Sequence, residues 1–151
     1  MYILQSEEYK NLMKKQAKEL ITFLLKNESE FSLTANMSNV DFEPTLPDKL
    51  AKQFGKFSLF VLANYTYSSI DLEDDYISFE AGFGDENYPS LVKIPYYAIF
   101  QILVDDVMVF VNNYATLGRE NTEQESKELE SKDKSMNIFK NNLKNSDFFK
   151  K

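Results

Sequence analysis

The chain has 151 residues, which is within the usual range for one domain, and 43% of them are hydrophobic and 15% aromatic. It contains no cysteine and no histidine, which excludes disulfides, thiolate metal sites, Ser-His-Asp catalysis and nearly every zinc site. Its net charge of -7 disfavours the basic patch that nucleic-acid binding requires, so we expect no nucleic-acid partner.

The N-terminal sequence MYILQSEEY meets acidic residues after three apolar ones, which is not the pattern of a signal peptide. No window approaches ~18 uninterrupted apolar residues, so we expect no membrane partner and a cytoplasmic location. Up to Asn112 the chain carries 9 lysines against 17 acidic residues, a net charge of -8, whereas the remainder carries 8 basic and 7 acidic residues, or +1. The part that we expect to fold is therefore the acidic part.

An amphipathic helix is predicted near the N-terminus, over residues 6–26. Ser6 is a suitable N-cap, and Glu7 and Glu8 suit the positive end of the helix dipole. The apolar stripe either packs on the domain that follows or lies partly against a second copy of the chain. It recurs mostly at spacings of three and four and consists of Tyr9, Leu12, Met13, Ala17, Leu20, Ile21, Leu24 and Leu25.

Two patterns predict strands in the next part of the chain. Residues 31–36 alternate between apolar and polar side chains, and residues 56–63, KFSLFVLA, form a nearly continuous apolar run rich in sheet-forming types. Between them, a polar and proline-containing stretch breaks the pattern, and residues 48–54 are expected to form one short helical turn. Residues 64–69 are polar and predict a turn.

Residues 76–111 contain the clearest strand signals. Alternation from Ile77 to Phe83 predicts a strand that ends at Gly84, and Gly82 inside it predicts a bulge or a close approach of another backbone. Residues 91–94 and 107–111 predict two further strands, and a helical turn led by Pro95 is expected between them, over residues 96–103. The whole pattern is mainly β with an N-terminal α-helix, typical of a small barrel or sandwich over residues 31–111.

The composition changes after Tyr114. Residues 118–135 contain one large apolar side chain, Leu129, so we expect a disordered linker, bounded at residues 115–135, after a domain of residues 1–114. Residues 136–151 form a candidate docking tail, because apolar side chains return among basic ones. The alternative is a C-terminal helix, residues 127–144, that folds back on the domain.

No group in the sequence indicates catalysis. Acidic clusters at residues 73–75, 85–86 and 105–106 fall on predicted turns, where acidic residues are common. The Gly82-Phe83-Gly84 segment lacks the GK[ST] continuation of a phosphate-binding loop. We therefore expect no catalytic residue, no metal and no cofactor. The tyrosines Tyr65, Tyr67, Tyr96 and Tyr97 are either part of a binding surface or the rim of a core.

Four segments, taken in order, resemble SspB, the stringent starvation protein B family of adaptors for the ClpXP protease. They are LPDKLAKQFGKFSLFVL, IDLEDDYISFEAGFG, VKIPYYAIFQIL and VMVFV. The family patterns are VPxxxxxxGxIxLNI, LxL, FxARFGG, VPxxAVxAIY and MxF. The chain departs from them at three positions: Gly82 replaces the arginine of FxARFGG, Asp85 replaces its last glycine, and Phe60 replaces the asparagine of LNI. The matching positions are Pro47, Gly55, Leu72, Val109, Phe110 and residues 59–61, 79–85 and 94–103.

This resemblance implies a small Sm-like or SH3-like β-barrel whose N-terminal helix forms a homodimer through Leu12, Leu20 and Leu24. It also implies a groove for an extended degradation tag of the ssrA type, and delivery of the tagged substrate to the ClpX unfoldase by a tethered tail. The expected groove residues are Phe79, Ala81, Phe83, Ala98, Ile102 and Val109. The expected docking residues are Met136, Ile138, Phe139 and Lys140, and docking through residues 147–151, alone or in addition, is the alternative. The alternatives are an Sm-like nucleic-acid-binding protein and a carboxylate-based hydrolase.

Overall fold

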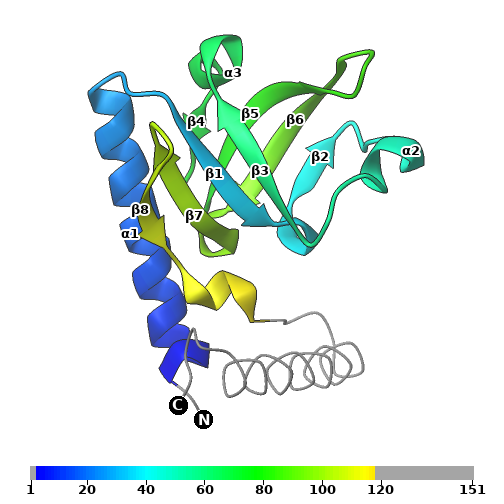
Figure 1. Cartoon of the computed structure of the whole chain (residues 1–151). Helices are drawn as coiled ribbons and strands as arrows, with labels where there is room; N and C mark the ends of the chain where they lie inside the picture. Colours follow the sequence, from blue (N-terminus) through cyan, green and yellow to red (C-terminus); the bar gives the residue numbers. More distant parts are fainter. Residues whose placement is uncertain (1–2, 118–151) are drawn as a thin grey trace, which may run out of the picture. The chain divides into compact units, whose positions relative to one another are not determined.

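The computed structural model describes residues 3–117, and the predicted docking tail and nearly all of the predicted linker lie outside them. A helix is followed by short, mostly antiparallel strands (Figure 1). The elements are η1 (Ile3–Gln5), α1 (Glu7–Lys26), β1 (Phe31–Asn36), η2 (Met37–Asn39), β2 (Asp41–Glu43), α2 (Asp48–Ala51), β3 (Phe57–Leu62), α3 (Asn64–Ser68), β4 (Asp71–Leu72), β5 (Tyr76–Phe83), β6 (Tyr88–Pro95), η3 (Tyr96–Ala98), β7 (Ile99–Val104), β8 (Val107–Val111) and η4 (Asn113–Thr116).

The predicted N-terminal helix is confirmed as α1. Ser6 is its N-cap, because the Ser6 hydroxyl accepts a hydrogen bond from the Tyr9 amide at 3.0 Å. The helix buries one face, made of Met13, Ala17, Ile21 and Leu24, and it packs mainly on η3. The N-terminal stripe therefore serves first as core packing.

The strands form two antiparallel sheets, ordered β3-β1-β7-β8 and β2-β6-β5-β4. The prediction of a mainly β domain with an N-terminal helix is confirmed, whereas the described residues form eight strands, more than the sequence patterns predicted. The short strands β2 and β4 were missed because three and two residues are too few for a periodic pattern. The sheets share one core: the Phe60 and Phe79 rings, one from each sheet, have centroids 5.7 Å apart.

Three local predictions are wrong. Residues 96–103 do not form a helical turn throughout, because only Tyr96–Ala98 is helical and Ile99–Val104 pairs with both β1 and β8. Residues 64–69 contain the helix α3 rather than a turn. Gly82 carries no bulge, since the β5–β6 register is continuous. For residues 99–104 and for Gly82, pairing with neighbouring strands, which the local sequence does not contain, decides the conformation.

The domain also continues beyond the predicted boundary at residue 114. Ala115 is buried, and its carbonyl accepts a hydrogen bond from the Asn36 side chain at 2.9 Å. A compact unit accordingly reaches Leu117, so residues 115–117 belong to the domain and not to a linker.

Asn112 connects the end of β8 to the segment around η3. Its side chain is fully buried, and its amide nitrogen donates to the carbonyls of Tyr97 and Ile99, each at 3.0 Å. Its side-chain oxygen accepts from the Tyr114 amide at 2.9 Å. The bonds with Ile99 and Tyr114 satisfy buried backbone groups that would otherwise be costly to enclose.

We predict that Asn112→Asp lowers the free energy of unfolding by at least about 3 kcal/mol at neutral pH. A carboxylate of the same shape cannot donate to the two carbonyls, and it brings a charge into a buried position. Urea denaturation of the full chain measures the loss. Asn113→Asp, at the exposed neighbouring position, is the matched control and is expected to change stability by less than about 0.5 kcal/mol. Equal stability of the two variants would contradict this role of Asn112.

Candidate functional site

A pocket with a volume of about 670 Å³ opens on the sheet β2-β6-β5-β4, at the end where β5 and β6 join. Side chains from β2, α3, β5 and β6 surround it. Its lining residues are Glu43, Pro44, Tyr65, Thr66, Glu80, Ala81, Gly82, Asn87, Tyr88, Pro89, Ser90 and Leu91. They combine aromatic and proline surface with two carboxylates.

The floor of the pocket is set by strand register. Glu80 of β5 is paired with Leu91 of β6, which is in turn paired with Glu43 of β2. Phe79 and Val92, the neighbours of Glu80 and Leu91, are fully buried, so the row Glu80-Leu91-Glu43 faces away from the core. Since neighbouring strands lie ~4.8 Å apart, the two glutamates stand on opposite sides of Leu91 with α-carbons about 10 Å apart.

One wall of the pocket comes from α3. The Tyr65 hydroxyl donates to Glu80 Oε1 at 2.5 Å, and the Glu80 amide donates to Ser69 Oγ at 2.8 Å. These bonds hold α3 beside β5. The hydrogen bond from Tyr65 to Glu80 and the charge of Glu80 raise the pKa of the Tyr65 hydroxyl. The tyrosine therefore stays neutral, and its ring remains 67% exposed toward solvent.

The opposite wall is held by contacts between β2 and β6. Ser90 Oγ donates to the Pro44 carbonyl at 2.9 Å, and the Lys93 ammonium lies 3.4 Å from Glu43 Oε1. Glu43 therefore has a cationic neighbour. Glu80 has none: among the ion pairs of residues 3–117, no partner of Glu80 occurs, and its carboxylate accepts only the neutral Tyr65 hydroxyl.

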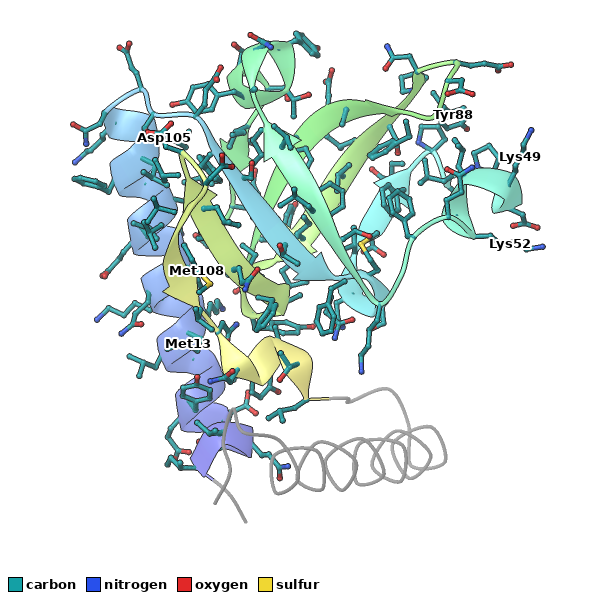
Figure 2. The ribbon with its side chains drawn as sticks, viewed as in Figure 1. Met13, Lys49, Lys52, Tyr88, Asp105 and Met108 are labelled. Atoms are coloured by element: carbon teal, nitrogen blue, oxygen red, sulfur yellow. The ribbon has the colours of Figure 1, made fainter. Side chains whose placement is uncertain are left out.

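Two glycines shape the hairpin end of the pocket. A β-carbon on Gly82 would lie 1.8 Å from Asn87 Oδ1, so the Asn87 side chain occupies the space beside Gly82. Gly84 has φ +76°, and a β-carbon there would lie 2.5 Å from a methyl of Leu50. Tyr88 stands at this end of the hairpin, and Lys49 of α2 and Lys52, the residue that follows α2, extend outward beside that helix (Figure 2).

The six predicted groove residues do not form one surface. Phe79, Ala98 and Ile102 are at most 1% exposed, so their side chains pack in the core. Phe83 packs against Phe42, at a centroid distance of 5.5 Å. Val109 belongs to the other sheet, and Ala81 alone lines the pocket.

The predicted groove residues on β5 lie on its core face, because alternation in the sequence marks the apolar face of a strand. The floor of the pocket lies on the opposite face of β5. Glu80, Leu91 and Glu43 were therefore missed, since only the pairing of three strands brings them into one row. Of the four candidate tyrosines, Tyr65 lies in the pocket wall, whereas Tyr96 is fully buried.

The three predicted dimer residues differ in exposure. Leu12 is 47% exposed, Leu20 is partly buried, and Leu24 is buried at 5%. Phe23, which was not predicted, is 58% exposed and lies eleven positions after Leu12, which places both on one side of the helix. An exposed apolar pair thus remains on α1 beside its core-facing stripe.

No family model matches this chain, and no curated protein matches it. Within residues 3–117, no three acidic side chains gather in a way that could hold a metal ion. In the same part of the chain, no helix is long and apolar enough to cross a membrane.

The two glycines are predicted to differ in their tolerance of a side chain. Gly84→Ala should lower the free energy of unfolding by about 1–2 kcal/mol, because its positive φ disfavours any β-carbon and Leu50 must move. Gly82→Ala should cost less than about 1 kcal/mol, because the end of an exposed Asn87 side chain can move aside. Thermal or urea unfolding of both variants tests the order, and an equal or reversed order would refute it.

Proposed function

We propose that this chain is a peptide-binding adaptor of the SspB type, which holds an extended degradation tag of the ssrA type and delivers it to the ClpXP protease. The observation that carries the proposal is the position of the pocket. Its floor includes Ala81 and Gly82, which belong to the segment FEAGFG, and this segment carries much of the resemblance to the SspB family. The pocket and the family signature thus coincide at one strand.

The backbone beside the pocket supports an extended ligand. The Glu80 amide points away from β6, toward Ser69, so by alternation the amide and carbonyl of Gly82 point toward the same edge of β5. Pro89, the partner of Gly82, has no amide proton, which agrees with this assignment. No strand within residues 3–117 pairs with that edge beyond Ser78. Gly82 therefore offers a donor and an acceptor to a peptide backbone.

The remaining parts of the proposal concern assembly. The two sheets, with their shared core, would be the sides of a small Sm-like barrel, and Leu12 with Phe23 would contribute to a helix-mediated homodimer. Docking on the ClpX unfoldase is assigned to Met136, Ile138, Phe139 and Lys140, outside the described residues. Tethering a bound tag to the unfoldase raises its effective concentration there, so two weak contacts act together.

We predict that Leu91→Phe in the full chain weakens binding of an ssrA-type tag peptide by at least about tenfold, because the larger side chain rises from the floor and fills the pocket. Fluorescence anisotropy with a labelled peptide measures the affinity, and a urea titration checks that the variant folds. Leu59→Phe, the same change at an exposed position on β3, is the control and should bind normally. A folded Leu91→Phe variant with unchanged affinity would place the tag elsewhere.

The tail is tested separately by a double substitution, Ile138→Asp with Phe139→Asp, in the full chain. The tag affinity should stay the same, whereas the concentration of tagged substrate needed for half-maximal degradation by ClpXP should rise at least tenfold, since avidity is lost. Leu129→Asp serves as the control for an apolar-to-acidic change and should leave degradation unchanged. Normal delivery by the double variant would remove these residues from the docking role.

A further inference from the structure

The acidic charge of the described domain is concentrated in its second half. Residues 3–56 carry 8 lysines and 8 acidic residues, and residues 57–117 carry 9 acidic residues against one lysine, Lys93. Two of these nine acidic residues, Asp74 and Asp75 in the turn before β5, form ion pairs with Lys18 and Lys14 of α1. Of the nine acidic residues of this half, Glu80 lines the pocket, and Asp85 and Glu86 lie in the β5–β6 hairpin beside it.

Inside the pocket the uncompensated charge is that of Glu80. Its carboxylate is exposed on the outer face of β5, and it accepts one hydrogen bond, from Tyr65. The single lysine of this half of the domain lies on β6, where its ammonium is near Glu43 and above the Tyr76 ring. No lysine or arginine is among the residues that line the pocket. Within residues 3–117 no cation pairs with Glu80, so its charge is open to a cationic ligand.

The surface next to Glu80 suits the stem of a long cationic side chain. Leu91 lies directly across from Glu80 on the neighbouring strand, and the Tyr65 ring stands beside it on α3. Lysine and arginine combine an apolar stem with a charged end, so the stem can cover Leu91 while the charge reaches Glu80. An aromatic ring at the same place adds attraction for a cation.

We propose that the pocket selects an extended peptide that carries a lysine or arginine, with the cationic group paired to Glu80 and its stem on Leu91 and Tyr65. The inference rests on the proposed function, and it names the chemistry of the tag. An acidic residue at the same place would face the Glu80 carboxylate, and two like charges in contact repel.

The experiment uses the full chain and a set of ssrA-type tag peptides in which each position in turn carries Lys, Gln or Glu. At one position, Lys should bind roughly three- to tenfold more tightly than Gln, and Glu more weakly than Gln. The preference should shrink as salt is raised from low to 1 M, because a partly exposed pair is screened. Glu80→Gln should abolish the preference while it keeps an acceptor for Tyr65, and Glu80→Lys should reverse it.

Glu86→Gln is the matched control, because Glu86 is exposed in the same hairpin but does not line the pocket. It should retain the full preference for Lys. If no peptide binds the native chain, the proposed function fails. If peptides bind with no charge preference at any position, or if Glu80→Gln keeps the preference, only the present inference fails. A double variant, Lys150→Gln with Lys151→Gln, tests whether the basic end of this chain occupies the pocket. If this variant binds Lys peptides severalfold more tightly than the native chain, the occupant is that end, and the proposal of an external peptide is wrong.

Discussion

The pairing register between β5 and β6 is the constraint on which the pocket depends. Eight consecutive pairs run from Tyr76–Pro95 to Phe83–Tyr88 without a shift. A slip by one residue would turn every side chain to the other face, so Phe79 would leave the core and Glu80 would enter it. Pro89 reinforces the register, because a proline has no amide proton and fits only where its strand does not donate to the neighbour. The hydrophobic pattern and one proline thus fix the same arrangement.

The beginning of β5 is fixed by α1 and η3. The Tyr96 hydroxyl donates to the Glu73 carbonyl at 2.7 Å, and Lys14 binds Asp75 in the same turn. The hydrogen bond and charge of Lys14 lower the pKa of the Asp75 carboxyl. A carboxyl with a lowered pKa stabilises the fold above its unfolded pKa, and this contribution is lost as the pH falls through the folded value. Because Asp75 is exposed, the ion pair orients the turn while the buried Tyr96 contributes more to its stability.

The sequence predicted those elements whose signal is local. The bounds of α1 follow from its periodicity and its Ser6 cap, and β1 and β8 follow from alternation and from an unbroken apolar run. The segment of β7, IFQILV, has no local feature that separates a buried strand from a buried helix, and its pairing with β1 decides the outcome. The pocket was hidden for a related reason. Its floor takes one residue from each of three strands, so no single segment contains its pattern.

The chain's main departure from the SspB-like signature is consistent with the charge of the pocket. The signature has an arginine where this chain has Gly82, two residues after Glu80 and on the same face of β5. An arginine there would place a guanidinium beside Glu80 and neutralise it within the protein. In this chain the Asn87 side chain fills the space in which a β-carbon would lie, and Asn87 brings no charge. Without an arginine at position 82, the Glu80 carboxylate has no cationic neighbour on its own strand, and the cation proposed for this place is the lysine or arginine of a bound peptide.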